Sequence, residues 1–216
     1  MANAAENLTP VTLELGGKSP AIVGPDFSIR KAAERIMWVK LFNAGQICTN
    51  VDYVFIPEGR VDEFVAHCQR VVQERLPDIN GNDFTSIIDQ RSYDRLMFSL
   101  KDAESQGATL VNLLPQQTPD SALRKIAPHL VLNPNAEMLL MQREIFGPIL
   151  PVKTYRHPEE VAQYINSDDR PLAIYPFTHD VDLQDFYITH VMSGGVSVNE
   201  ALLHVAQHDL PFGGVG

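Results

Sequence analysis

Three glycine-punctuated segments of this sequence carry side chains that could perform covalent chemistry. Cys48 ends the segment LFNAGQIC, Glu14 lies in LELGGK, and Glu144 opens EIFGP. A thiolate attacks a carbonyl carbon well because it combines high nucleophilicity with an accessible pKa. A carboxylate whose pKa is raised toward neutrality can act as a general base. The set predicts covalent catalysis at the Cys48 sulfur, with Glu14 as the base.

Local patterns indicate how two of these residues are positioned. The apolar residues 11–15 predict a short strand that stops at Gly16 and Gly17. A carboxylate at the end of such a strand should be partly desolvated, which raises its pKa. The two glycines, lacking side chains, let the backbone approach the reacting centre closely. Glu14 is therefore expected beside that centre.

The nucleophile is expected in a turn. Residues 28–43 predict a helix with Ser28 as its N-cap, and Gly45 ends it, which leaves Cys48 in the turn beyond. Simpler interpretations exist: Cys48 could be a buried turn cysteine and Glu14 a solvated strand-end glutamate. Glu144 could be a salt-bridged carboxylate beside a buried phenylalanine.

Taken together, the segments resemble the catalytic domain of the aldehyde dehydrogenase family. The runs SGGVSVN at 193–199 and PFGG at 211–214 match the same family. The resemblance implies that Cys48 is the nucleophile and Glu14 the general base. It further implies that Glu144 holds the hydroxyls of the nicotinamide ribose and that Phe146 helps to place the nicotinamide ring.

The resemblance also assigns residues that shape the site. Gly16 and Gly17 would line it, and Asn199 would brace the Cys48 loop. The implied reaction is attack of Cys48 on an aldehyde to form a thiohemiacetal, followed by hydride transfer to NAD or NADP. Glu14 would then activate the water that hydrolyses the resulting thioester. No metal takes part in this scheme.

Several segments look like the class 3-like branch of the family, and within it like bacterial coniferyl aldehyde dehydrogenases. They include NLTPVTLELGGKSP at residues 7–20 and LPFGGVG at 210–216. This similarity implies an aromatic or medium-chain aldehyde as substrate, with Ile47 and Thr49 touching it. It also implies a parent enzyme that is a homodimer or a higher homo-oligomer.

Two other functions stay open. A cofactor-free cysteine hydrolase could act on activated esters or thioesters. Such enzymes usually recruit a histidine partner, and none of the seven histidines is placed by a motif. The chain could also be a non-catalytic domain that retained the fold.

Alternating strand and helix patterns predict an α/β fold, with a mainly parallel twisted sheet covered by helices on both faces. Further helices are predicted over residues 61–76, 91–106, 158–167 and 180–192. Further strands are predicted over 52–56, 108–112, 129–132, 149–155, 172–178 and 195–199. Residues 113–128 are expected to be a surface excursion.

The domain organisation follows from the resemblance. In the family, a cofactor-binding domain precedes the LELGG segment and carries its own glycine-containing turn and an oxyanion-stabilising Asn. Neither is found here, so residues 1–10 are interpreted as a remnant of that domain. Residues 11–216 are interpreted as a catalytic domain truncated at its C-terminus, isolated from its cofactor domain.

Composition limits the class of partner and the compartment. With 17 Lys and Arg against 27 Asp and Glu, the net charge of −10 argues against nucleic acid and anionic membranes as partners. The apolar stretches are too short to span a bilayer. Cys68 falls on the apolar stripe of a predicted helix and should be a buried structural thiol. Two reduced thiols fit a cytoplasmic enzyme.

Overall fold

A computed structural model describes residues 1–211 and 213, and its centre is a seven-stranded sheet of order β3-β4-β5-β2-β1-β6-β7. The pairing of β3 with β4 is antiparallel, and the other neighbours pair in parallel. The strands are β1 (Pro20–Val23), β2 (Tyr53–Pro57), β3 (Thr109–Asn112), β4 (His129–Leu132), β5 (Ile149–Tyr155), β6 (Ala173–Phe177) and β7 (Gly195–Val196). The predicted, mainly parallel α/β sheet is confirmed.

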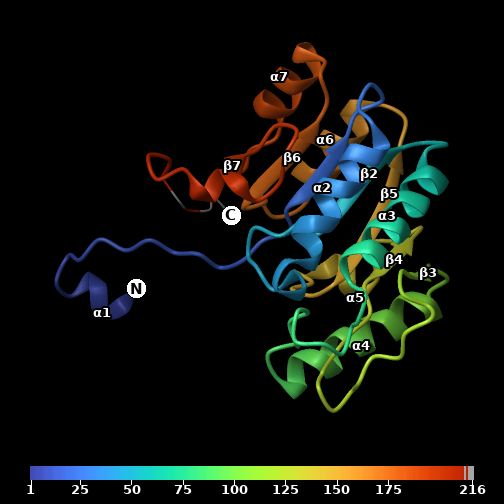
Figure 1. Cartoon of the computed structure of the whole chain (residues 1–216). Helices are drawn as coiled ribbons and strands as arrows, with labels where there is room; N and C mark the ends of the chain where they lie inside the picture. The colour runs from blue at the N-terminus through green and yellow to red at the C-terminus, as the bar shows by residue number, and fades with distance from the viewer. Residues whose placement is uncertain (212, 214–216) are drawn as a thin grey trace.

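Helices cover both faces of this sheet. Figure 1 shows α2 and α3 packed on the near face, while α6 lies behind the strands. The helices are α1 (Ala2–Ala5), α2 (Ile29–Leu41), α3 (Val61–Arg75), α4 (Gln90–Ser105), α5 (Leu139–Gln142), α6 (Pro158–Asn166) and α7 (Val181–His190). Because both faces of a parallel sheet are covered, its central strands are mainly apolar, and all residues of β1 and β6 are buried.

The helix that leads to the nucleophile begins as predicted. The hydroxyl oxygen of Ser28 accepts a hydrogen bond from the Lys31 amide, and Ile29, Ala32 and Ile36 lie on the buried face of α2. Its neighbour α3 buries Cys68 completely, with the thiol reduced. The prediction of a structural thiol at this position is confirmed.

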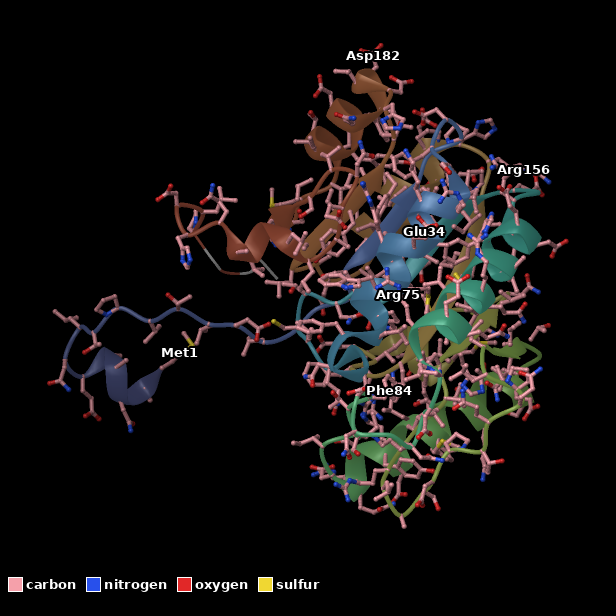
Figure 2. The ribbon with its side chains drawn as sticks, viewed as in Figure 1. Met1, Glu34, Arg75, Phe84, Arg156 and Asp182 are labelled. Atoms are coloured by element: carbon pink, nitrogen blue, oxygen red, sulfur yellow. The ribbon has the colours of Figure 1, made fainter. Side chains whose placement is uncertain are left out.

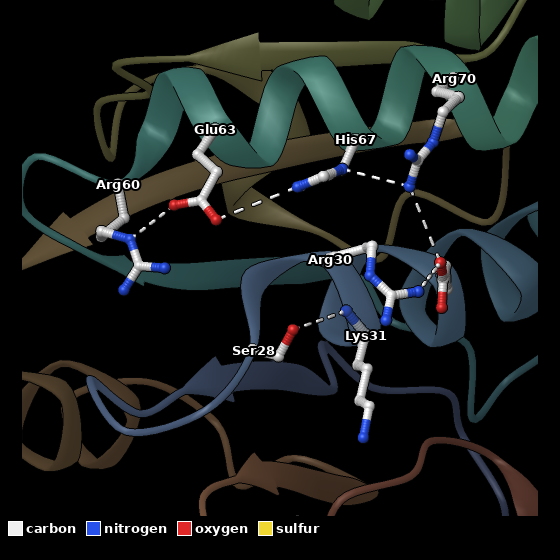
Figure 3. Close-up of polar contacts among 8 residues, drawn as sticks. Ser28, Arg30, Lys31, Arg60, Glu63, His67 and Arg70 are labelled. Atoms are coloured by element: carbon white, nitrogen blue, oxygen red, sulfur yellow. Dashed lines mark hydrogen bonds and ion pairs between the residues drawn. The ribbon is translucent and has the colours of Figure 1, made fainter.

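Polar contacts cross the outer surface of the α2–α3 pair, as Figure 3 shows. Glu34 on α2 accepts from Arg30 at 2.8 Å and lies 3.8 Å from Arg70 on α3. Arg60 and Glu63 pair at 2.7 Å within one turn of α3. Exposed pairs of this kind contribute about 0–1 kcal/mol each. The buried apolar faces of α2 and α3 therefore hold the two helices on the sheet.

The N-terminal arm differs from the sequence-based expectation. Residues 11–15 form no strand, and Leu13, Glu14 and Leu15 are exposed. Figures 1 and 2 show α1 and the segment after it standing away from the sheet, with Met1 at the end of the arm. A strand needs a hydrogen-bonded neighbour, and this arm has none within the described residues.

The strand that the sequence analysis missed is β1, which lies in the middle of the sheet between β2 and β6. Other predictions need smaller corrections. The predicted surface excursion 113–128 buries Leu113, Leu114 and Ile126. The last predicted strand keeps only Gly195 and Val196 as β7. Within the described residues, no helix is both long and apolar enough to cross a membrane.

Candidate active site

Cys48 lies in a turn whose backbone is unusual. After α2, the short 3-10 helix η1 (Phe42–Gly45) contains three residues in the left-handed region, Asn43 (φ 52°), Ala44 (φ 52°) and Gly45 (φ 77°). Non-glycine residues rarely adopt this conformation, and it is concentrated at functional sites. The backbone leaves η1 directly into the Cys48 turn, as predicted.

Side-chain hydrogen bonds stabilise this conformation. Asn43 Nδ2 donates to the Gln46 carbonyl at 2.9 Å, and Gln46 Nε2 donates to the Asn43 carbonyl at 3.0 Å. Gln46 also joins the turn to a distant loop, through the Ser86 carbonyl at 3.1 Å and the Ile88 amide at 2.9 Å. The Asn and Gln of the LFNAGQIC segment therefore build the turn. The sequence analysis gave them no role.

Two buried side chains donate hydrogen bonds to backbone carbonyls in and just after the Cys48 turn. Lys40 Nζ donates to the Val51 carbonyl at 2.8 Å, and the Tyr175 hydroxyl on β6 donates to the Thr49 carbonyl at 2.5 Å. Thr49 is only 1% exposed. Contact of Thr49 with the substrate stays a prediction that its burial does not favour, whereas Ile47 lines an open pocket.

The charges of the Glu14 and Glu144 carboxylates act on the Cys48 thiol, although the three residues come from separate segments of the sequence. Partial burial raises the pKa of the Cys48 thiol, and the negative charge of Glu14 raises it further. The Thr49 amide lowers this pKa, and the charge of Glu144 raises it. The structure thus brings Cys48, Glu14 and Glu144 to one place, although Cys48 is half-buried rather than fully exposed.

Glu14 is positioned by its own glycine turn. Its Oε1 accepts a hydrogen bond from the Gly16 amide at 2.8 Å. The carboxylate is exposed, so the expected desolvation at a strand end is wrong. The reason is the missing strand: the arm that carries Glu14 lies in solvent.

The pKa of the Glu144 carboxyl is shifted well away from its usual value. Burial raises its pKa to about 7, aided by the charges of Asp52 and Glu14, while the Gly17 amide and Lys18 work in the opposite direction. Gly16 has a φ of 85°, which favours glycine, and a Cβ there would displace the Glu144 carboxylate from its present position. The glycine lets the two segments touch.

Phe146 follows Glu144 in an unusual conformation. It has a φ of 50° and is 37% exposed, so its ring is accessible beside the carboxylate. This left-handed conformation is uncommon for a non-glycine residue.

The interpretation of Asn199 is corrected. The side-chain Oδ1 accepts a hydrogen bond from the Thr178 amide at 2.8 Å. The backbone amide of Asn199 donates to the Pro176 carbonyl at 2.7 Å, and its backbone carbonyl accepts from Arg35. Asn199 therefore braces the end of β6 rather than the Cys48 loop. In the PFGG motif, Phe212 and Gly214 lie outside the described residues.

Next to the Cys48 turn is a pocket of about 520 Å³, lined by aromatic and aliphatic side chains together with the charged Arg75 and Asp83. The rings of Trp38 and Phe42 stack at its edge, with centroids 5.7 Å apart and planes inclined by 8°. Ile47, the residue before the nucleophile, also lines it. Both aromatic rings are more than one-third exposed. Such a surface suits an apolar or aromatic ligand.

Two charged residues of the site were not anticipated. Lys18 and Asp52 pair beside Glu144 with little exposure. Their signal in the sequence was charge within apolar surroundings, since Asp52 stands between Val51 and Tyr53. Within the described part of the chain, no group of three or more His, Cys, Asp or Glu residues is arranged to hold a metal ion.

Comparison with known proteins identifies the arrangement. The model of the "Aldehyde dehydrogenase family" matches residues 1–216. The chain belongs to the aldehyde dehydrogenase family.

Among curated members of this family, a coniferyl aldehyde dehydrogenase of Pseudomonas sp. is 47% identical over the whole chain, which covers 46% of that protein. A probable coniferyl aldehyde dehydrogenase of Pseudomonas aeruginosa is 49% identical, with 45% of it covered. The dimeric NADP-preferring aldehyde dehydrogenase of Canis lupus familiaris is 36% identical, with 46% covered. The chain spans about half the length of the curated relatives it matches.

A solved aldehyde dehydrogenase has the same fold. The substrate-bound AldH of Staphylococcus aureus superimposes with a TM-score of 0.90 at 35% identity, covering 100% of this chain and 46% of the other. The α/β architecture described above is therefore that of about half of a family member.

Proposed function

We propose that this chain is the catalytic half of an NAD(P)-dependent aldehyde dehydrogenase in which Cys48 is the nucleophile. The observation that carries the proposal is the position of the Cys48 thiol in a braced turn, with the carboxylates of Glu14 and Glu144 close enough for their charges to raise the pKa of the thiol. It is the proximity of base and nucleophile that supports the role, since the raised pKa by itself favours the neutral thiol. A thiol combined with carboxylates suits formation of a thioester and its hydrolysis by activated water.

In the proposed reaction, the Cys48 sulfur attacks the aldehyde carbonyl carbon. The backbone N–H of Cys48 donates to the developing oxyanion. A bound nicotinamide would supply the hydride acceptor that the oxidation requires. The substrate is then held as a thioester on Cys48. Glu14 takes a proton from water, the water oxygen attacks the thioester carbonyl, and the acid leaves with release of the thiol.

The residues of the EIFGP segment fit the ribose and ring of NAD or NADP. The Glu144 carboxyl titrates near neutrality and can accept hydrogen bonds from two ribose hydroxyls. The accessible Phe146 ring offers a face for the nicotinamide. Gly16 and Gly17 keep this corner open, since side chains there would meet Glu144 and Leu172.

The aldehyde is proposed to be aromatic, as coniferyl aldehyde is. The stacked pair of Trp38 and Phe42 beside the Cys48 turn supports this substrate class, and so do the names of the relatives that are 47% and 49% identical. We propose a homo-oligomeric, cytoplasmic parent enzyme, in line with the dimeric canine relative.

The proposed domain division is a cofactor-binding domain that ends near residue 10 and a catalytic domain from residue 11. The exposed apolar side chains of the N-terminal arm support this division. Leu8 is 92% exposed and Leu15 is 81% exposed. Exposed apolar surface of this kind marks a region that packs against another part of a protein.

A cysteine hydrolase finds less support. The ring of His204 is paired with the Ser197 hydroxyl at 3.1 Å. Among the described residues, the histidine rings that form hydrogen bonds do so with partners other than Cys48. A histidine base of the hydrolase type is thus missing from the turn.

The test compares the full-length enzyme with this 216-residue chain. The full-length enzyme should reduce NAD or NADP on addition of an aromatic aldehyde, and brief quenching should trap an acyl group on Cys48. The chain alone should show no such turnover and only weak dinucleotide binding by calorimetric titration. Turnover without acylation of Cys48, or cofactor-independent ester hydrolysis as the main activity, would overturn the proposal.

A further inference from the structure

Lys18 and Asp52 form an ion pair at the point where the segments of the site meet. The two side chains are 15% and 4% exposed. Replacing one partner of a buried pair leaves an uncompensated charge, which is strongly unfavourable. Such a pair is retained only with hydrogen bonds that satisfy the remaining donors and acceptors.

Those additional hydrogen bonds go to one segment. Lys18 Nζ donates to the Leu140 carbonyl at 3.0 Å and to the Arg143 carbonyl at 3.1 Å. Asp52 Oδ1 accepts from the Ile145 amide at 2.8 Å. The residues immediately before and after Glu144 are therefore both held, one by the lysine and one by the aspartate.

Lys18 and Asp52 also belong to the segments that carry the proposed base and the proposed nucleophile, respectively. Lys18 ends the run LELGGK that contains Glu14, and Asp52 follows the Cys48 turn. The Asp52 amide donates to the Ser19 carbonyl at 2.8 Å, so the backbones of these two segments are also joined. One ion pair links all three segments that carry the proposed chemistry.

We propose that Lys18 and Asp52 are positioning residues, which fix the Glu144 carboxylate relative to Cys48 and thereby set its hold on the nicotinamide ribose. This inference rests on the proposed function. A charged residue beside Glu144 could act only by screening the charge of its carboxylate. The hydrogen bonds from Lys18 to the Arg143 carbonyl and from the Ile145 amide to Asp52 instead hold the backbone on both sides of Glu144, which indicates a positioning role. Loosening the pair should therefore weaken dinucleotide binding more than it slows the chemical step.

The chain offers a matched control for a buried lysine. Lys125 is 5% exposed and donates to two backbone carbonyls, those of Gly81 at 3.1 Å and Phe84. Lys125 belongs to none of the three segments, but the Phe84 that it contacts lines the pocket beside the Cys48 turn. It therefore serves as a control for the dinucleotide KM and not for the aldehyde KM. Lys125→Met, like Lys18→Met, removes two hydrogen bonds from a buried lysine to backbone carbonyls, and it therefore reports the effect of that loss outside the three segments.

The experiment measures KM for NAD and NADP, and kcat, in the full-length enzyme carrying Lys18→Met, Asp52→Asn or Lys125→Met. We expect the first two to raise the dinucleotide KM about tenfold or more, the effect of one lost charge-assisted contact, with a smaller change in kcat. Lys18→Arg should restore most of the binding. Lys125→Met should leave both constants within about twofold.

The double variant Lys18→Met with Asp52→Leu covers the case in which a single variant fails to fold, since apolar replacement of both partners is often tolerated. It should show the same rise in KM. A dinucleotide KM that matches wild type or the Lys125→Met control would overturn the positioning role. Cys48→Ala is run alongside: if that variant keeps full turnover, the proposed function itself fails.

Discussion

The α-carbon of Gly45 lies directly against the carbonyl group of Gly147. A Cβ added to Gly45 would overlap the Gly147 carbonyl oxygen and lie 3.2 Å from the Pro148 nitrogen. The backbone of the nucleophile turn thus touches the backbone of the EIFGP segment with no side chain between them. Gly45 also has a φ of 77°, which favours glycine independently of the contact.

This contact predicts an unusually damaging small substitution. Gly45→Ala should lower the free energy of unfolding by more than the ~1–2 kcal/mol expected for a left-handed alanine, because the two segments must also move apart. Gly59→Ala is the control, since Gly59 has a φ of 81° and open space around it. Urea unfolding of both variants measures the difference. Equal destabilisation would show that the Gly45–Gly147 contact is not tight.

The nucleophile assignment predicts a complete loss of function in the full-length enzyme. Cys48→Ala or Cys48→Ser should abolish aldehyde oxidation, because no other described thiol is near the site. Cys68→Ser should leave the chemistry intact and cost about 1–3 kcal/mol of stability, since it buries a hydroxyl in the fully buried position of Cys68. Steady-state assays and thermal unfolding separate the two effects. Oxidation that survives in the Cys48 variants would contradict the mechanism.

The base assignment predicts a change of rate-limiting step. Glu14→Gln should slow hydrolysis of the thioester more than its formation, because the amide cannot take a proton from water. Rapid mixing should show a burst of reduced dinucleotide and then slow turnover. Glu6→Gln, in the same exposed arm, serves as the control. Equal rates in wild type and Glu14→Gln would exclude Glu14 as the base.

The position of Glu144 predicts a pH-dependent contribution to stability. Its pKa is raised from 4.5 to about 7, mainly by burial, so the native state binds the proton more tightly than the unfolded state does. The contribution of this carboxyl is complete below pH 4.5 and is lost as the pH rises through 7. Glu144→Gln should therefore gain stability relative to wild type between pH 5 and 8, as urea unfolding can measure. A constant difference across that range would refute the raised pKa.

The aromatic pocket predicts a substrate-dependent effect. Trp38→Ala should raise the KM for an aromatic aldehyde by removing the ring that stacks on Phe42, while the KM for a short aliphatic aldehyde should change little. Trp38 is already 38% exposed, so the loss of stability should be modest. Equal effects on both substrates would place the aldehyde elsewhere.

Local patterns predicted much of the architecture. The predicted N-cap Ser28 bonds as expected at the start of α2, and the helix predicted from residue 180 is α7, which the Asp180 side chain caps. Local patterns did not predict as well which segments pair as strands. Residues 11–15 have the composition of a strand but lie in solvent, whereas the short run at Pro20–Val23 forms the central β1. A strand exists only with its neighbours, and one neighbour of β1 lies far along the sequence.

The candidate site divides in the same way, between what motifs predict and what only the three-dimensional structure shows. Motifs indicated the segments of Cys48, Glu14 and Glu144, because the residue types themselves suggest the chemistry. They did not indicate which segment would be exposed or what would hold the segments together. The exposure of Glu14 and the pairing of Lys18 with Asp52 depend on distances in space, which spacing along the chain does not contain.

The central place of β1 bears on how the protein is synthesised. Ala21 in β1 pairs with Tyr175 in β6, and the Tyr175 hydroxyl bonds the Thr49 carbonyl of the nucleophile turn. Cys48 therefore emerges from the ribosome long before the strand that buries the floor of its turn. Until β6 has been made, the Thr49 carbonyl lacks the Tyr175 hydroxyl that bonds it. The nucleophile turn, encoded early in the chain, is therefore completed only when one of the last strands joins the sheet.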